Sequence, residues 1–280
     1  MIRLTLSALA VLLATPVLAQ EAQRVISLGG SVTEIAVALG AQDRLIARDT
    51  TSNYPPGIED LPDVGYIRAL SPENVLALSP DLIIAEGDAG PPEAVEVLKS
   101  AGIPFALMPE ANGPDAIPAK IAAVAEALDK IEEGKALAAT VSAGLDAAKA
   151  RAAAVSEPKR VLFILSLQGG RVMAGGEGTE AEGIIALAGG VNAGTGFQGY
   201  KPMTDEAVIA AAPDAILMMD REGDLAVADA EALSHPALAE TPAGKAGRVI
   251  RMDGMLMLGF GPRTPEAADA LYRALYGDGG

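Results

Sequence analysis

"DVGYIRALSPENVLALSPDLIIA", from Asp63 to Ala85, is nearly repeated later in the chain by "FQGYKPMTDEAVIAAAPDAILMM", from Phe197 to Met219. Both copies contain Gly-Tyr, a Ser or Thr two residues before a Glu, a small apolar run, and Pro-Asp before a strand-like run. The chain has only five tyrosines and four phenylalanines. Tyrosines at the same point of both copies therefore indicate that a whole structural unit is duplicated.

A second matched feature precedes each copy. Arg24 begins "RVISLGG" and Arg160 begins "RVLFILS", and each run predicts a buried strand before a glycine-rich turn and a helix. The glycine spacing does not match a nucleotide phosphate loop. Strands that alternate with helices predict parallel α/β units. The expected fold class is α/β, with two pseudo-symmetric lobes built on central, mainly parallel sheets.

The two strand-to-helix turns carry the residue spacing of a helix capping box. Ser31 lies three residues before Glu34, and Thr179 lies three residues before Glu182. In a capping box these side chains satisfy the unpaired amides at the helix start. The spacing predicts helices that begin at Ser31 and Thr179.

An Ala-rich segment from Pro114 to Pro158 lies between the two units and has apolar residues at helical spacing. Because Ala, Leu, Glu and Lys form helices well, it predicts one long interdomain helix, with Gly134 and Gly144 as its weak points. Such a connector implies a stiff body with a cleft between the lobes. The expected division is a signal peptide at 1–19, an N-terminal lobe at 20–113, the linking helix at 114–158 and a C-terminal lobe at 159–280.

The N-terminal segment has the layout of a secretory signal peptide. "MIRLTLSALAVLLATPVLAQ" has one basic residue, an apolar run from Leu4 to Ala14, and small residues before a cleavage point after Ala19. The apolar run is short for a membrane-spanning helix, and the chain has no Cys that could carry a lipid anchor. The mature chain is expected in the periplasm as a soluble monomer.

Composition argues against two classes of function. A formal net charge of −16 disfavours nucleic acid as a partner, because its phosphates would repel the chain. Hydrolase chemistry is not expected either, since there is no Cys, one His and no Ser in a G-x-S-x-G elbow. The chain is expected to bind its ligand and not to transform it.

Cations occur in the loops that are expected to face the cleft. In open α/β sheets the loops that leave the carboxyl ends of the strands form the ligand crevice. An acidic chain that places cations there suits an anionic small molecule. The candidate binding residues are Arg48, Tyr66, Arg68, Arg171, Tyr200, Lys201 and Arg221.

Tyr66 and Arg68, in "GYIR", suit the binding of ferric iron. Ferric iron prefers the anionic phenolate oxygen, and a neighbouring guanidinium stabilises that anion. Tyrosine is an axial ligand of haem iron in catalase, and haem also brings two carboxylates that need basic partners. By residue chemistry alone, a packing role for Tyr66 with a hydrogen-bonded hydroxyl stays open.

Several motifs in order resemble the substrate-binding proteins of the rigid-helix class, which serve importers of haem, cobalamin, siderophores, and zinc or manganese. The resemblance is strongest to the haem-binding members. It is carried by "RDTTSNYP" (Arg48 to Pro55), "LPDVGYIRAL" (Leu61 to Leu70), "GYKP" (Gly199 to Pro202) and "GFGPRT" (Gly259 to Thr264). It implies a periplasmic protein that captures haem between its lobes and delivers it to the permease dimer of an ABC importer.

The resemblance also implies roles for individual residues. Tyr66 would be the axial ligand of the haem iron, and Arg68 would support it. Tyr200 would stack on or cap the porphyrin, or would be only a relic of duplication packed at a lobe edge. Lys201 or Arg221 would reach a propionate.

Glu73 and Glu206 stand at matching points of the two copies, each two residues after a predicted helix cap. An acid in the first turn of a helix interacts favourably with the helix dipole. The rigid-helix class uses a glutamate at this position on each lobe to dock onto arginines of the permease. Both readings are compatible.

Other ligands on the same scaffold are the nearest alternatives. A zinc or manganese site needs several imidazoles with carboxylates, and the only histidine, His235, lies in a loop-like stretch where a structural role is expected. This favours one haem, held through Tyr66. A ferric siderophore or cobalamin remains the alternative cargo, although the absence of Trp is unusual for a siderophore binder.

Overall fold

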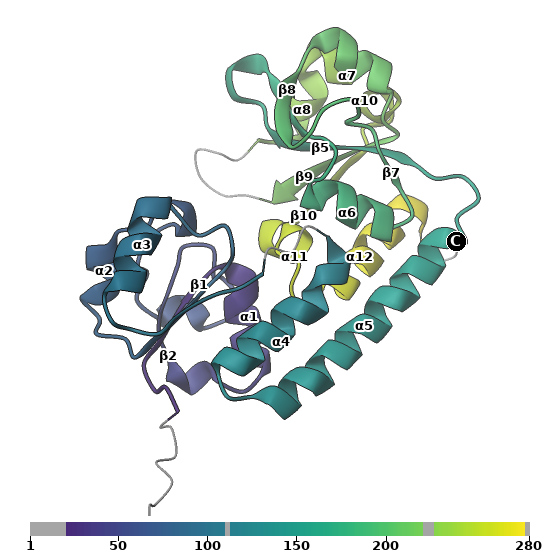
Figure 1. Ribbon diagram of the computed structural model, residues 1–280. Helices are drawn as coiled ribbons and strands as arrows, with labels where there is room; N and C mark the ends of the chain where they lie inside the picture. The colour runs from purple at the N-terminus through teal and green to yellow at the C-terminus, as the bar shows by residue number, and fades with distance from the viewer. Residues whose placement is uncertain (1–20, 110–112, 221–226, 278–280) are drawn as a thin grey trace, which may run out of the picture.

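The computed structural model describes residues 21–109, 113–220 and 227–277, so the predicted signal peptide at 1–19 and the candidate Arg221 lie outside the described residues. The described chain forms two α/β lobes and a pair of helices that runs between them (Figure 1). None of the described helices combines the length and the apolar character that a membrane crossing requires.

The first lobe contains a four-stranded sheet in the order β2-β1-β3-β4, and all three strand pairs are parallel. Its strands are β1 (Val25–Leu28), β2 (Leu45–Arg48), β3 (Leu82–Ala85) and β4 (Phe105–Leu107). Both β1 and β3 are buried along their whole length. Continuous apolar runs of this kind are typical of parallel strands that are covered on both faces.

The second lobe contains a six-stranded sheet in the order β10-β9-β5-β6-β8, with β7 paired to β5. Pairs β10–β9, β9–β5 and β5–β7 are parallel, whereas β6 runs antiparallel to both β5 and β8. The strands are β5 (Arg160–Ser166), β6 (Val172–Gly175), β7 (Val191–Asn192), β8 (Tyr200–Met203), β9 (Ala215–Asp220) and β10 (Val249–Asp253). The predicted mainly parallel sheets are confirmed, and the antiparallel β6–β8 pair is added to one edge.

The helices cover the sheets and connect the lobes. They are α1 (Gly30–Ala38), α2 (Pro72–Leu76), α3 (Pro92–Ser100), α4 (Ile117–Ala127), α5 (Ile131–Ala153), α6 (Glu180–Leu187), α7 (Asp205–Ala211), α8 (Asp229–Ser234), α9 (Pro236–Ala239), α10 (Pro242–Ala246), α11 (Gly254–Leu258) and α12 (Thr264–Tyr276).

The duplication has a structural basis in one Arg–Asp device that each lobe repeats. In the first lobe the amide of Arg24 donates to Asp81 (2.8 Å), and the Arg24 guanidinium donates to the carbonyl of Ser79 just after α2 (2.9 Å). In the second lobe the amide of Arg160 donates to Asp214 (2.8 Å), and its guanidinium donates to a carbonyl at the end of α7 (2.9 Å). The device pairs the unsatisfied carbonyls of a helix end with a cation, which explains why both copies keep Arg and Pro-Asp.

The linking segment differs from the predicted single helix. It forms two helices, α4 and α5, separated at Leu128–Lys130, where Asp129 adopts a positive φ of 55°. The two helices pack against each other, and a Cβ added at Gly134 would lie only 2.3 Å from the Cβ of Ala125. Gly134 is therefore not a weak point of one long helix, because it permits the close approach of two.

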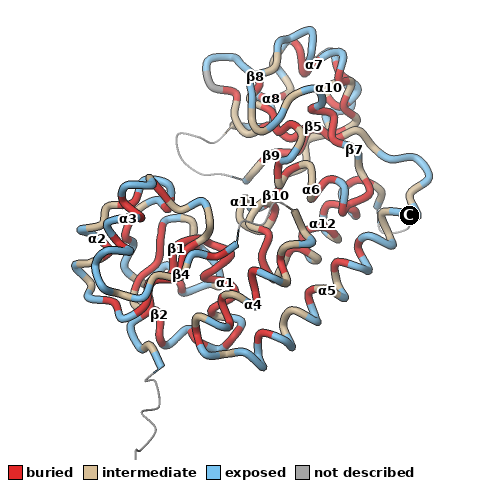
Figure 2. Tube along the Cα trace, viewed as in Figure 1, coloured by how far each residue is buried: buried red, intermediate tan, exposed pale blue. Residues whose placement is uncertain are grey.

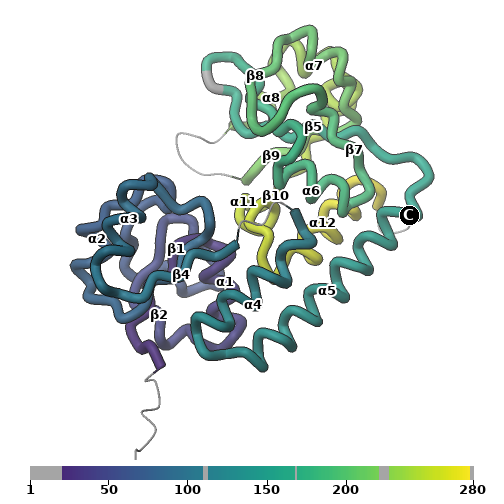
Figure 3. Tube along the Cα trace, in the orientation of Figure 1, coloured from purple at the N-terminus to yellow at the C-terminus, as the bar shows by residue number. Residues whose placement is uncertain are grey.

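The apolar core is continuous across the lobes and the linking helices. One buried cluster contains Ile35 of the first lobe, Ile121 of α4, Leu145 of α5 and Leu271 of α12. Figure 3 shows the C-terminal α12 (yellow) returning to lie beside α5, and Figure 2 shows α5 alternating between buried and exposed positions. Close-packed interiors transmit strain and resist deformation, so the connection between the lobes is stiff.

A buried ion pair joins the lobes and corrects the first predicted capping box. The N-cap of α1 is Gly29 and not Ser31, and side chains from other parts of the chain accept from the first amides of the helix, Thr51 from Gly30 (3.0 Å) and Glu86 from Ser31 (3.1 Å). Glu34 faces the second lobe instead, where it accepts from the Arg263 amide (3.1 Å) and the Arg263 guanidinium (3.0 and 2.9 Å). The guanidinium also lies over the ring of Tyr54, 3.4 Å from its centroid. The second predicted cap is confirmed, since Thr179 accepts from the amide of Glu182 (3.2 Å), but the Glu182 carboxylate accepts from the amide of Gly178 (2.7 Å), one residue before the N-cap.

Replacing Glu34 with Gln is expected to destabilise the protein, because it leaves the Arg263 charge in a largely buried place without its counter-ion. Breaking one side of a buried pair costs about 3 kcal/mol in free energy of unfolding. Urea unfolding followed by circular dichroism measures it. Glu96→Gln, which removes an exposed pair with Lys99 (3.1 Å), should change the free energy by less than about 1 kcal/mol. Equal effects of the two variants would contradict the bridging role of Glu34.

Candidate functional site

A cleft of about 920 Å³ lies between the lobes. Among the described residues its walls combine apolar side chains, two tyrosines and seven charged groups, of which five are acidic and two are basic. The residues that line it include Tyr66, Arg68, Glu86, Asp88, Lys120, Leu165, Glu180, Tyr200, Met219, Met255, Leu258 and Phe260. A concave, mainly apolar site of roughly 300–1,000 Å³ with a few convergent polar groups is typical of a small-molecule binding site.

Tyr66 projects into this cleft from the loop that follows Gly65. The backbone fixes its place because Val64 and Ile67 on either side are buried, while the tyrosine itself is 42% exposed. Gly65 has a φ of 106°, and Gly199, which precedes the second tyrosine, has a φ of 73°. Only glycine adopts such φ values without strain, which is why both copies read Gly-Tyr.

Arg68 holds the hydroxyl oxygen of Tyr66. Its Nη1 donates to that oxygen at 2.6 Å, and its Nη2 is paired with Asp88. Burial alone would lower the pKa of Arg68, but the hydrogen bond to Tyr66 and the charge of Asp88 outweigh it and raise the pKa above its ordinary value. Arg68 therefore stays charged, and a charged donor stabilises negative charge on the phenol oxygen.

Tyr200 faces the same cleft from the opposite lobe but has a different partner. It begins β8, packs edge-on against Phe163 with ring centroids 6.1 Å apart, and donates its hydroxyl to Glu180 at 3.1 Å. Burial, followed by the negative charge and hydrogen bond of Glu180, raises the pKa of Tyr200 above its ordinary value. Tyr200 is thus a neutral hydroxyl whose proton is committed to a carboxylate.

The two tyrosines therefore occupy matching positions in the sequence but have partners of opposite charge. A cation partners Tyr66, whereas an anion partners Tyr200. An oxygen next to a cation can serve as an anionic ligand, while an oxygen that donates to a carboxylate cannot do so without losing that hydrogen bond. The cleft is asymmetric across its pseudo-two-fold axis.

Three predicted cations do not line the cleft. Arg48 is not in a loop but is the last residue of β2, is 9% exposed, and forms an ion pair with Asp63 at 3.4 Å. Arg171 and Lys201 are both exposed, the former just before β6 and the latter in β8. Both were predicted in loops, but Lys201 lies in the edge strand β8, and the direction of neither side chain was predictable from the sequence.

His235 also lies away from the cleft lining. It is the N-cap residue of α9, and its Nε2 lies 3.1 Å from the carbonyl oxygen of Gly170. Within residues 21–109, 113–220 and 227–277, no group of three or more His, Asp and Glu side chains could hold a metal ion. The described chain thus offers no protein-only metal centre.

Six charged residues of the described cleft lining were not singled out from the sequence, and two of them, Asp220 and Asp253, end β9 and β10. Glu86 and Asp88 follow the carboxyl end of β3, where ligand loops are expected in parallel sheets, and Glu180 opens α6 directly after its N-cap Thr179. Lys120 lies on α4 among buried apolar residues. A lone lysine at a core position of an Ala-rich helix was the signal for it.

Glu73 and Glu206 are exposed in the first turns of α2 and α7, and both predicted caps are confirmed. The hydroxyls of Ser71 and Thr204 accept from the amides of Asn74 (3.4 Å) and Ala207 (3.2 Å). A hydrogen bond from its own backbone amide, and then one from the cap hydroxyl, lowers the pKa of each glutamate. Figure 1 shows α2 and α7 on the sides of their lobes that lie far from α5.

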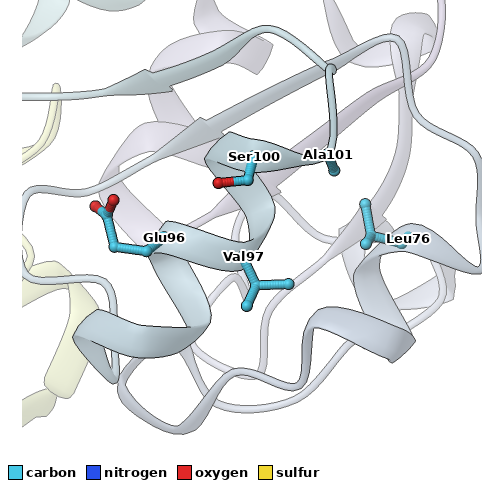
Figure 4. A pocket seen from close by; sticks show the side chains of 5 residues that line it. All are labelled: Leu76, Glu96, Val97, Ser100 and Ala101. Atoms are coloured by element: carbon cyan, nitrogen blue, oxygen red, sulfur yellow. The ribbon is translucent and has the colours of Figure 1, made fainter.

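A second hollow lies outside the cleft, on the surface between α2 and α3. Figure 4 shows its five lining side chains, which are Leu76, Glu96, Val97, Ser100 and Ala101. Its single charged group, Glu96, is already paired with Lys99. The hollow lacks the convergent polar groups of the cleft.

A family model described as "Periplasmic binding protein" matches residues 25–256. The chain belongs to this family. Its similarity to solved members covers both lobes and the linking helices together. The two-lobed α/β fold class predicted from the sequence is confirmed.

Three similar proteins place this periplasmic binding protein more closely. The solved "Periplasmic heme-binding protein BhuT in complex with two hemes" is 42% identical, over 90% of this chain and 97% of that one, with a TM-score of 0.85. The periplasmic vitamin B12 binding protein BtuF of Vibrio cholerae is 27% identical, over 91% and 97%, with a TM-score of 0.76. An uncharacterized ABC transporter substrate-binding lipoprotein of Bacillus subtilis, YvrC, is 27% identical over 92% of this chain and 82% of its own.

Proposed function

We propose that this periplasmic binding protein captures ferric haem in the cleft between its lobes, with Tyr66 as the axial ligand of the iron. One observation carries the proposal, namely the exposed hydroxyl of Tyr66 in the cleft with the Arg68 guanidinium 2.6 Å from its oxygen. The guanidinium stabilises the phenolate that ferric iron prefers. Asp88 in turn orients the guanidinium.

The asymmetry of the cleft supports Tyr66 over Tyr200 as the ligand. Glu180 holds the proton of Tyr200, and the raised pKa of Tyr200 opposes phenolate formation at neutral pH. In this proposal Tyr200 contacts the porphyrin face or edge as a neutral aromatic ring. Arg48, Arg171 and Lys201 are not among the residues that line the cleft, so the proposal does not rest on them.

The lining of the cleft fits a porphyrin. A haem is a flat apolar ring with a cationic centre and two carboxylates, so it needs apolar walls, an oxygen ligand and basic groups. Met219, Met255, Leu258 and Phe260 supply apolar contacts. Thioethers adapt well to irregular apolar surfaces. Haem is the cargo here and not a resident cofactor.

Similarity supports the same ligand class. The solved protein at 42% identity is a heme-binding protein, and the vitamin B12 binding protein is similar at 27% identity. Cobalamin is therefore the second candidate cargo, on the same scaffold. Export to the periplasm and delivery to the permease dimer of an ABC importer complete the proposal, with Glu73 and Glu206 as the docking residues.

Titration of the purified protein with hemin tests the proposal. Stoichiometric binding of one haem should produce an intense Soret band and a visible charge-transfer band of phenolate-ligated ferric iron. Cyanocobalamin, added in equal amounts, should not displace the haem. Failure of hemin to bind, together with tight binding of cyanocobalamin, would overturn haem as the cargo.

A further inference from the structure

Lys120 is a buried cation at a point where three parts of the protein meet. It belongs to α4, and the residue is only 3% exposed although it lines the cleft. Its Nζ donates to the hydroxyl of Ser31 in α1 at 2.7 Å and lies 3.4 Å from the carbonyl oxygen of Gly259, which follows α11. The ammonium therefore contacts both lobes from the linking helix.

The nearby carboxylates are committed to other donors. Glu86 accepts from the amide and the hydroxyl of Ser31 (3.1 and 2.7 Å), and Glu34 is paired with Arg263. Lys120 forms no ion pair with any carboxylate in the described part of the chain, and both of its acceptors are neutral. The charge of Lys120 is offset only indirectly, because the Ser31 hydroxyl accepts from Lys120 and donates to Glu86.

A buried cation without a direct counter-ion is costly, since a charge removed from water needs a paired charge or a full set of hydrogen bonds. An ammonium has three donors, and two have acceptors in the protein. We propose that Lys120 binds a carboxylate of the cleft's ligand, so that one propionate of the porphyrin enters the base of the cleft. This inference rests on the proposed haem-binding function and adds an anion subsite to it.

The subsite gives the ligand a defined orientation. Tyr66 and Arg68 hold the iron from the first lobe, while Lys120 attracts one carboxylate-bearing edge of the ring toward α4. A charge-assisted hydrogen bond in a site that excludes water is stronger than one at the surface. The cleft would thus distinguish a porphyrin with free carboxylates from one in which they are masked.

The test compares ferric haem with its dimethyl ester, which has the same ring and iron but no carboxylate charge. Titrations use the full mature protein in dilute detergent and follow the visible spectrum. The unaltered protein is expected to bind haem more tightly than the ester. Lys120→Met should weaken haem binding by about tenfold or more, and should change ester binding much less. Lys120→Arg, which keeps the charge, should retain most of the preference.

Lys135→Met is the matched control, because Lys135 is an exposed lysine on the neighbouring α5 that pairs with Glu132. It should bind both compounds as the unaltered protein does. An equal loss for haem and ester in Lys120→Met, or no loss for either, would overturn the carboxylate subsite. Should Lys120→Met not fold, equal affinity of the unaltered protein for haem and ester would overturn it as well. Failure of the unaltered protein to bind haem or ester would instead contradict the proposed function.

Discussion

Tyr66→Phe is expected to lower the affinity for ferric haem by about a thousandfold, equal to about 4 kcal/mol, and to abolish the phenolate charge-transfer band. The substitution keeps the aromatic ring and removes only the oxygen. Because Tyr66 is exposed in the cleft and Arg68 is the one partner of its hydroxyl among the described residues, the fold should tolerate the change. Spectral titration with hemin measures the affinity and the band together.

Tyr200→Phe is the matched control, since it deletes the corresponding hydroxyl of the opposite wall. It breaks the hydrogen bond to Glu180 but leaves the ring stacked edge-on against Phe163. We expect the charge-transfer band to persist and the affinity to change much less than in Tyr66→Phe. Loss of the band in Tyr200→Phe with its retention in Tyr66→Phe would reverse the assignment of the iron ligand.

Reversal of charge at both proposed docking residues, Glu73→Lys with Glu206→Lys, is expected to abolish haem-dependent uptake through the cognate permease. Haem binding should be unchanged, because both side chains are exposed on α2 and α7 and neither lines the cleft. The lowered pKa values keep both carboxylates charged at neutral pH. Like charges placed opposite permease arginines would repel them. Transport into vesicles that contain the permease measures the effect.

Glu132→Lys with Glu266→Lys provides the same change in net charge elsewhere. These exposed glutamates lie on α5 and α12, far from α2 and α7 in Figure 1. Uptake by this control should stay normal. Normal uptake by the Glu73/Glu206 variant would leave the helix dipole as the sole role of those acids.

Local signals predicted the parts of the fold that neighbours in sequence determine. Thr179, Ser71 and Thr204 cap their helices as expected, because a cap depends on amides only two or three residues away. Ser31 and Glu34 have the same spacing, but they do not form the predicted capping box. Their partners, Glu86 and Arg263, lie 55 and 229 residues away in the chain, and the local spacing gives no sign of them.

The candidate site was predictable where the duplication marked it. Both tyrosines and Arg68 line the cleft, since each lobe places its Gly-Tyr loop on the same side. The chemical difference between the tyrosines was not readable, because it depends on Asp88 and Glu180, which lie 20 residues away from their partners in the chain. The break at Asp129 was missed for a similar reason: strong helix propensity continues through it, and only the packing of α4 on α5 favours the turn.

The core shared by α4, α5 and α12 has a consequence for the competition between loaded and empty copies of the protein at the transporter. We expect a body without a soft hinge to change its outline little when cargo enters, so the spacing between Glu73 and Glu206 should be similar in the loaded and the empty form. Empty copies would then compete with loaded ones for the same docking site on the permease. Under the proposed function, uptake speed would then depend on the fraction of binding proteins that are filled, and overproduction of the protein in haem-poor medium would slow import.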